Sequence, residues 1–171
     1  FETSSTTMTF CLHELAFNQQ IQDKLRSEIR ETMEKNNGKL TYDGVMGMKY
    51  MNLVVNETLR KYPPGPLLFR KSNAKYTFLD TNTTLDPDTT VFISTFGLHM
   101  DEEYFPDPEK FIPERFTDEN IHQHPQYAFL PFGEGPRICI GARFALMQVK
   151  TGVSMILNKY RILPGPGETY K

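Results

Sequence analysis

The sequence has few cysteines and no long apolar segment, and each absence excludes a class of protein. Its two cysteines, Cys11 and Cys139, lie far apart among 171 residues, so they do not form the disulfide framework of a small secreted domain. Neither has a second thiol or a close pair of histidines beside it, which excludes the usual zinc patterns. No run of 18 apolar residues occurs, so we expect no helix here to span a membrane.

The chain also lacks a strong charge of either sign and a recognisable start. Its formal net charge of -2 provides no basic surface for nucleic acid. It opens at Phe1, inside a pattern typical of a helix, with no initiator methionine and no signal peptide. We therefore expect these residues to be a piece of a longer fold. Helices that lack their partner surfaces should then expose Leu25, Ile29, Val54 and Leu59.

Apolar spacing predicts a mainly helical chain with a small sheet. Helices are expected over 7–16, over 18–37 and over 48–62. Asn18 is the expected N-cap of the second helix and Gly38 its C′ glycine. Strands are expected at 67–71, 76–79 and 91–95, followed by an irregular, proline-rich stretch over 101–131. A last helix is expected over 140–159.

The segment 132–141, FGEGPRICIG, carries the most chemical information. Its glycines and proline predict a turn that ends at the start of the last helix, with Cys139 at that junction. A helix N-terminus favours the thiolate, which is the form of cysteine that binds metals. Arg137 can pair with an anionic group at the rim of a cofactor, and Gly141 leaves room for a flat group. The alternative is a free, buried cysteine at a helix start.

This segment resembles the cysteine-loop signature F-x-x-G-x-R-x-C-x-G of the cytochrome P450 family. The matching residues are Phe132, Gly135, Arg137, Cys139 and Gly141. The resemblance implies that Cys139 is the axial ligand of a haem iron and that Phe132 shields its sulfur. It also implies that Arg137 and Arg70 bind the haem propionates, and that Leu67, Leu68 and Phe69 contact substrate.

Two charged motifs extend the resemblance. Glu57 and Arg60 share one helix face, which taken alone is usually an exposed surface pair. With Arg115 of Pro-Glu-Arg-Phe they are similar to the E-x-x-R and P-E-R-F motifs of the family, which implies a buried ion network with a structural role.

The first residues are similar to another family motif. Serines and threonines are unusual in an apolar helix, and a polar chain end is one interpretation of them. Glu2 and Thr3 resemble the acid–alcohol pair of the family's long distal helix. The resemblance then implies that these two residues relay protons at the haem and are catalytic.

The resemblance covers essentially the whole chain. It implies one partial cytochrome P450 domain over 1–171, from the end of the distal helix through short strands, meander and cysteine loop to the proximal helix. The segments FETSSTT and FGEGPRICIG are most similar to those of insect microsomal members. The implied function is a haem-thiolate monooxygenase that acts on small lipophilic substrates.

The resemblance also implies partners and a location. Electrons would come from NADPH through a flavoprotein reductase, with Lys150 as a candidate contact. An N-terminal anchor outside these residues would hold the protein on the cytoplasmic face of the endoplasmic reticulum membrane.

Alternatives to this function remain at this point. One is a haem-thiolate enzyme that rearranges peroxides, which the Glu2-Thr3 pair argues against. Another is a haem-binding fragment without turnover. His122 and His124 suggest a metal site but lack a third ligand. His99 is expected to satisfy a backbone group near a strand end.

Overall fold

The computed structural model describes residues 1–170, and it confirms a mainly α chain with a small amount of sheet. The helices are α1 Glu2–Phe17, α2 Gln19–Lys35, α3 Tyr42–Gly47, α4 Lys49–Lys61, α5 Thr95–His99 and α6 Ala142–Lys159. The strands are β1 Leu67–Lys71, β2 Tyr76–Thr77, β3 Thr84–Leu85 and β4 Thr90–Ser94. Short 3-10 helices lie at Pro113–Phe116 (η1), Ile121–Gln123 (η2) and Gly135–Arg137 (η3).

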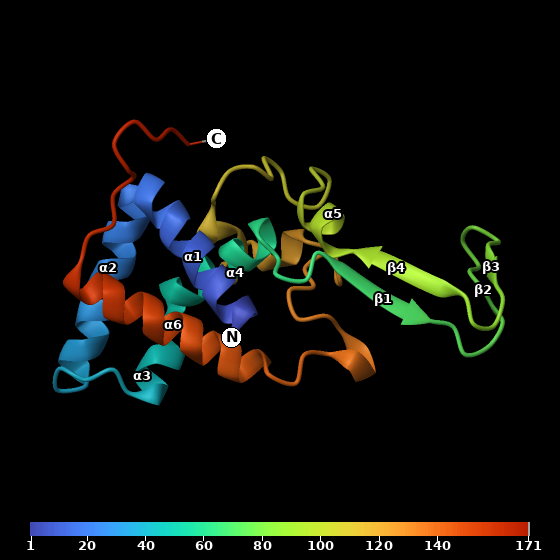
Figure 1. Ribbon diagram of the computed structural model, residues 1–171, viewed down its shortest axis with the longest axis horizontal. Coiled ribbons are helices and arrows are strands. Elements are labelled where there is room, and N and C mark those ends of the chain that lie inside the picture. Colours follow the sequence, from blue (N-terminus) through green and yellow to red (C-terminus); the bar gives the residue numbers. More distant parts are fainter. Residues whose placement is uncertain (171) are drawn as a thin grey trace.

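Helices α1, α2, α4 and α6 pack into one helical body, with α6 lying across α1 in Figure 1. Their facing apolar positions form the main core. Leu25, Ile29, Val54 and Leu59 are between 0% and 3% exposed. The expectation that these four would be exposed was wrong, because the helices of this chain cover one another's apolar faces.

The ends of α2 differ in detail from the prediction. The side chain of Asn18 does not cap α2 and instead donates to the carbonyl oxygen of Glu14 at 2.9 Å. At the other end, Asn37 takes the left-handed position with φ 54°, and Gly38 follows with φ 78°. The Gly38 N–H donates to Met33 O at 2.8 Å, so Gly38 lies one position later than the C′ glycine we expected.

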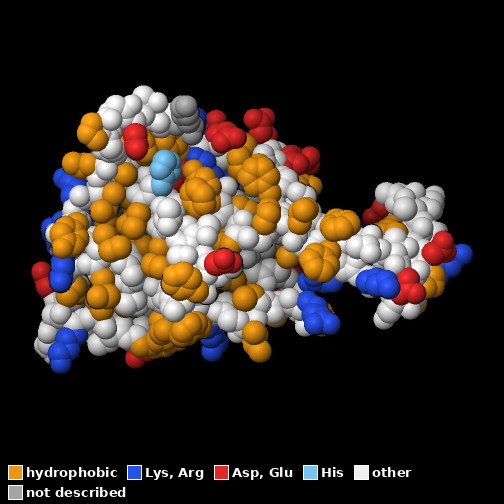
Figure 2. Space-filling model, in the orientation of Figure 1, with side chains coloured by type: hydrophobic (Ala, Val, Ile, Leu, Met, Phe, Trp, Pro, Cys, Tyr) orange, Lys and Arg blue, Asp and Glu red, His pale blue; other side chains and the backbone are white. Residues whose placement is uncertain are grey.

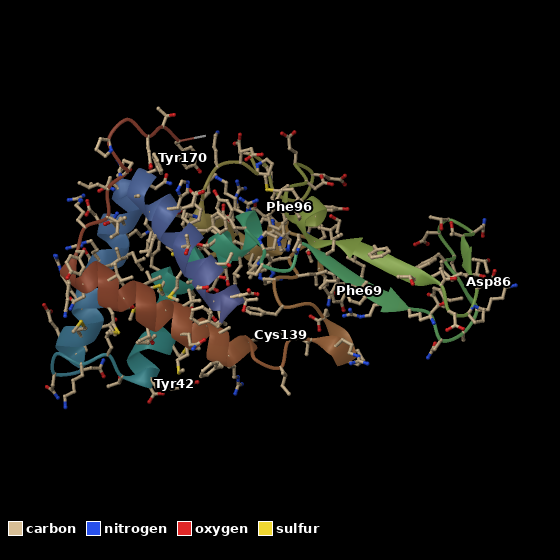
Figure 3. The ribbon with its side chains drawn as sticks, viewed as in Figure 1. Tyr42, Phe69, Asp86, Phe96, Cys139 and Tyr170 are labelled. Carbon is tan, nitrogen blue, oxygen red and sulfur yellow. The ribbon has the colours of Figure 1, made fainter. Side chains whose placement is uncertain are left out.

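A two-stranded ribbon extends away from the helical body (Figure 1). Strands β1 and β4 pair antiparallel, with Leu68 opposite Ile93 and Arg70 opposite Val91. Strand β2 is shorter than predicted and pairs with β3, which the sequence did not predict. Figure 3 places Asp86 at the outer end of the ribbon, far from Cys139.

The stretch over 101–131 is irregular, as predicted, apart from η1 and η2. It has its own small core of Phe105, Phe116 and Ala128. Figure 2 shows hydrophobic side chains gathered on the visible face of the helical body, with charged ones mostly at its edges and on the ribbon. Among residues 1–170, no helix combines the length and apolar character needed to cross a bilayer.

Candidate active site

Cys139 lies in the loop that leads into α6. Its backbone N–H donates to Phe132 O at 2.9 Å, and its carbonyl oxygen accepts from the N–H of Ala142 at 3.3 Å. Helix α6 begins at Ala142, slightly later than the expected 140. The Cys139 residue is exposed and forms no disulfide with Cys11. The loop therefore fixes the backbone of Cys139 while leaving its thiol accessible.

Two glycines of this loop are required by its backbone. Gly133 has φ +72° and Gly135 has φ +76°, in the left-handed region that other residues rarely adopt. Gly141 differs, because its φ of −90° suits any residue. A Cβ at Gly141 would meet nothing within 4 Å. The backbone of residues 1–170 thus gives no steric reason for glycine at position 141, and space for a bound group stays the prediction there.

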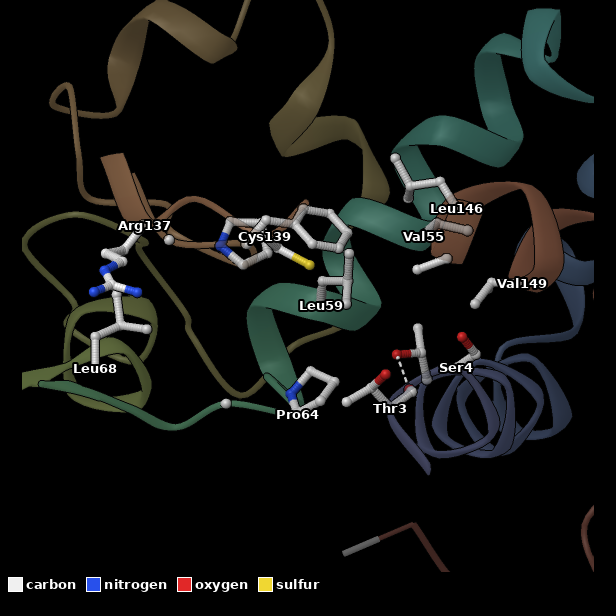
Figure 4. Close-up of a pocket in the computed structure, with 16 residues that line it drawn as sticks. Thr3, Ser4, Val55, Leu59, Pro64, Leu68, Arg137, Cys139, Leu146 and Val149 are labelled. Atoms are coloured by element: carbon white, nitrogen blue, oxygen red, sulfur yellow. Dashed lines mark hydrogen bonds between the residues drawn. The ribbon is translucent and has the colours of Figure 1, made fainter. Parts of the chain in front are cut away.

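A cavity of about 310 Å³ opens beside Cys139 (Figure 4). The first turns of α1, the inner face of α4, β1, the cysteine loop and α6 all contribute to its wall. The apolar part of the lining comes mainly from Val55, Leu59, Leu68, Phe132, Leu146 and Val149. In Figure 4 the sulfur of Cys139 points into this space. The cavity therefore combines one thiol with a largely apolar wall.

The two residues of the predicted acid–alcohol pair have different positions. Thr3 lines the cavity together with Cys139, and its carbonyl oxygen accepts a hydrogen bond from Thr7 Oγ1 at 2.9 Å. Glu2 lies in the first turn of α1, is exposed, and does not line the cavity. The structure thus brings Thr3 and Cys139 to one space and leaves Glu2 outside its lining.

The two predicted propionate-binding arginines share a neighbouring cavity. Arg70 and Arg137 both line a space of about 690 Å³ beside β1, and Arg137 also lines the Cys139 cavity. Arg70 Nη1 donates to the carbonyl oxygen of Phe69 at 2.9 Å. The structure therefore places both arginines on the wall of one cavity, and Arg137 joins that cavity to the one beside Cys139.

The predicted substrate stretch is divided by the alternation of β1. Leu68 is half-buried and lines both cavities. Leu67 and Phe69 are 54% and 68% exposed and line only the neighbouring one. Leu68 is therefore the one residue of the three that reaches the wall around Cys139.

Glu57, Arg60 and Arg115 form one buried ion cluster. Arg60 donates to both carboxylate oxygens of Glu57, at 2.7 and 2.9 Å, and both side chains are 0% exposed. Arg115 Nε lies 3.3 Å from Glu57 Oε1. Burial is the largest influence on the pKa of Arg115 and lowers it from its ordinary value.

The cluster also binds the backbone of the irregular stretch. Arg115 donates to Pro106 O at 2.5 Å and to Asp107 O at 2.7 Å, and Arg60 donates to Pro108 O at 2.7 Å. The cluster therefore fixes residues 106–108 against α4.

Comparison with known proteins decides the family. The family model described as cytochrome P450 matches residues 1–171. The chain belongs to the cytochrome P450 family. It is 49% identical over 164 residues to cytochrome P450 6k1 of Blattella germanica, across 96% of this chain and 31% of that protein. It is also 49% identical over 161 residues to a probable cytochrome P450 6a13 of Drosophila melanogaster, across 94% of this chain and 33% of that protein.

A third insect relative agrees with these two. The chain is 46% identical over 164 residues to cytochrome P450 6B5 of Papilio glaucus, across 96% of this chain and 34% of that protein. The resemblance to insect members of the family is thereby confirmed. The chain spans about a third of the length of these curated relatives. Membership of the cytochrome P450 family implies a haem cofactor.

One sequence expectation about this cytochrome P450 chain was wrong. Lys150 was a candidate surface contact for a reductase, but it is only 3% exposed and donates to Asn52 Oδ1. Burial lowers the pKa of Lys150 from its ordinary value. The helical spacing was the missed signal, because Val153 and Leu157 follow Lys150 on the buried face of α6.

His124 of the irregular region lies within hydrogen-bond distance of two backbone carbonyl oxygens. His124 Nδ1 lies 2.9 Å from Tyr104 O, and Nε2 lies 3.1 Å from Arg115 O. Within the described part of the chain, no group of three His, Cys, Asp or Glu residues could hold a metal ion. His99 satisfies backbone groups, as expected, but its ring has two such partners, the carbonyl oxygen of Arg60 and the N–H of Leu130.

Proposed function

We propose that the natural protein carrying these residues is a haem-thiolate monooxygenase. It inserts one oxygen atom of O₂ into a small lipophilic substrate and reduces the other atom to water. The overall reaction balances when O₂, substrate, NADPH and one proton yield the hydroxylated product, water and NADP⁺. The observation that carries this proposal is that Cys139 and Thr3 line the same cavity.

The choice of Cys139 as ligand is supported by its contrast with Cys11. Cys11 is 0% exposed, and burial raises the pKa of its thiol to about 12. A thiol of that kind stays protonated and does not bind a metal near neutral pH. Cys139 is exposed and lies in a loop whose backbone is held by Phe132 O. Cys139 is therefore the cysteine of the described chain that can supply an accessible thiolate.

The residues around Cys139 fit a haem. Its iron would be held by the Cys139 thiolate, its propionates by Arg70 and Arg137, and its apolar faces by the aliphatic and aromatic wall. When bound, haem supplies the redox chemistry, which a thiolate ligand favours by donating electron density to the iron. Phe132 lines the cavity beside the sulfur and would keep water away from it.

Thr3 and Glu2 would deliver protons during the reaction. Thr3 presents a hydroxyl group on the cavity wall, which can donate and accept a hydrogen bond in turn. Glu2 is the adjacent carboxylate and is exposed to solvent. In the proposed path, a proton would pass from water by way of Glu2 to the hydroxyl of Thr3.

Leu68 and the apolar wall would define the substrate side of the cavity. Leu67 and Phe69 would contact only a substrate large enough to extend along β1. Peroxide rearrangement is the competing reaction, and the position of Thr3 on the cavity wall favours the monooxygenase. The reductase partner, the membrane anchor and the endoplasmic reticulum location belong to this proposal and are supported by the resemblance to insect microsomal proteins.

A pair of cysteine variants tests the proposal. Cys139→Ser in the natural full-length protein should abolish the thiolate–CO Soret band of the reduced haem protein and its NADPH-dependent turnover with reductase. Cys11→Ser is the matched control and should keep both. A normal thiolate–CO band in Cys139→Ser would refute the assignment. Turnover that proceeds with peroxide alone, and never with O₂ and NADPH, would favour the competing reaction.

A further inference from the structure

His99 is a buried histidine that the proposed mechanism does not use. It is the last residue of α5 and is 0% exposed. Its ring lies against the rings of Phe105 and Phe129, with centroids at 6.3 and 5.3 Å. Its two ring nitrogens lie against α4 and against the segment that precedes the cysteine loop.

The partners of these nitrogens define one tautomer. The N–H of Leu130 donates to Nε2 at 2.9 Å, so Nε2 must carry a lone pair. Nδ1 then carries the proton and donates to the carbonyl oxygen of Arg60 at 3.2 Å. Burial supports the neutral ring, because it lowers the pKa of His99 from 6.5 to about 4. A neutral ring with one donor and one acceptor satisfies both contacts.

His99 and Arg60 hold each other by two hydrogen bonds. Arg60 Nη1 donates to the carbonyl oxygen of His99 at 2.8 Å, while His99 donates to that of Arg60. Arg60 is itself fixed by Glu57. The imidazole ring is therefore bonded to the backbone of Arg60, and the guanidinium of the same residue is bonded to Glu57 and to the backbone of His99.

The other side of the ring leads to Cys139 through the backbone. The N–H of Leu130 donates to His99, and the carbonyl oxygen of Leu130 accepts from the N–H of Gly133 at 3.1 Å. Phe132, two residues further on, accepts the N–H of Cys139 at 2.9 Å. Hydrogen bonds, together with the backbone of residues 130–133, thus join Arg60 and His99 to the cysteine loop.

We propose that His99 is a positioning residue that sets the Cys139 loop against α4 through the N–H of Leu130. This inference rests on the proposed function, in which Cys139 is the haem ligand. It assigns to His99 no contact with haem or substrate, only control over where the ligand loop lies.

Two substitutions separate the contacts of the ring. The amide of His99→Gln can occupy the place of Nε2 and accept from Leu130. The amide of His99→Asn can occupy the place of Nδ1 and leaves the N–H of Leu130 without a partner. The exposed His122 supplies the control variant His122→Gln. All three are made in the natural full-length protein.

The first readout is amide hydrogen exchange of Leu130 and Cys139 in the haem-free protein. Exchange at both should rise by at least about tenfold in His99→Asn and stay near wild type in His99→Gln and His122→Gln. In the haem-loaded protein, only His99→Asn should broaden or shift the thiolate–CO Soret band. Wild-type exchange at Leu130 and Cys139 in a folded His99→Asn variant overturns the proposal.

A second measurement does not depend on the variants folding. The ¹⁵N shifts of the His99 ring in the wild-type protein should show Nδ1 protonated and Nε2 unprotonated between pH 6 and 8. The opposite tautomer, or an imidazolium ring, would contradict the proposal. Both the exchange and the tautomer readouts are independent of haem, so they separate failure of this inference from failure of Cys139 as the ligand.

Discussion

The ammonium group of Lys61 lies 2.8 Å from the carboxylate of Glu14, and the two side chains are 6% and 0% exposed. Glu14 also accepts from Tyr62 at 2.6 Å and from Tyr170 at 2.9 Å. Burial acts to lower the pKa of Lys61, but its hydrogen bonds to Glu14 and Tyr170 outweigh burial and raise that pKa. This cluster joins α1, α4 and the C-terminal segment through one carboxylate.

Lys61→Met should therefore be strongly destabilising. The variant leaves the buried Glu14 carboxylate without a cation, although both tyrosines still donate to it, and we expect a loss of about 3 kcal/mol in the free energy of unfolding. Lys71→Met is the matched control, because Lys71 pairs with Asp88 at 2.8 Å with both side chains exposed. That control should change stability by less than about 1 kcal/mol in urea unfolding. Equal losses in the two variants would contradict the prediction.

Arg115→Ala should damage folding and haem retention more than the loss of one surface charge. It removes a cation from Glu57, leaves the carbonyl oxygen of Pro106 without its donor and leaves that of Asp107 with only the N–H of Lys110, at an expected cost of about 3–5 kcal/mol. Lys110→Ala is the control, since Lys110 pairs with Asp107 on the exposed surface. Thermal unfolding and haem content report the difference. A wild-type melting temperature in Arg115→Ala would place Arg115 outside any buried network.

Thr3→Ala should uncouple the reaction without preventing binding. Removal of the hydroxyl interrupts the proposed proton path at the cavity wall, so product per NADPH should fall and hydrogen peroxide should rise, while haem content and substrate binding stay normal. Thr9→Ala is the control, because Thr9 lies on the same helix, is exposed and does not line the cavity. Unchanged coupling in Thr3→Ala would reduce Thr3 to a helix residue.

The depressed pKa of His99 should make stability depend on pH. The unfolded chain protonates this ring near pH 6.5, whereas the folded chain does so only near pH 4, because burial disfavours the charged ring. The contribution of the neutral His99 ring to the free energy of unfolding is therefore fully present above pH 6.5. It is lost as the pH falls from 6.5 to 4, and the loss amounts to about 3 kcal/mol. His99→Gln should lack this component, so the wild-type and variant unfolding free energies should converge as the pH falls. A constant difference across that range would contradict the prediction.

The sequence was sufficient to predict features that depend only on neighbouring residues. The segment 132–141 predicted the cysteine loop, and the spacing of Glu57 and Arg60 predicted that they share one helix face. The spacing of apolar residues predicted where the long helices lie. The short elements were harder. Helix α3 is held by the Thr41 cap, with Gly44 N–H donating to Thr41 Oγ1 at 3.1 Å, and it was not predicted because six residues show little periodicity.

Long-range partners could not be predicted from the residues alone. The bonds of His99 reach Arg60, 39 positions away, and Leu130, 31 positions away, and no local pattern contains either. The burial of Lys150, in contrast, could have been predicted from the helical period. Its charge led us to expect it on the surface instead. Pairing of Glu57 with Arg115, 58 positions apart, came only from the family resemblance.

The cluster around Glu14 also constrains the order in which the chain can mature on the ribosome. Lys61 and Tyr62 follow Glu14 by 47 and 48 positions, but Tyr170 follows it by 156. The carboxylate can therefore gain its first two partners well before the third, which arrives only when Tyr170 has left the exit tunnel. Until then, any contact between α1 and α4 is made with one donor to the Glu14 carboxylate still missing.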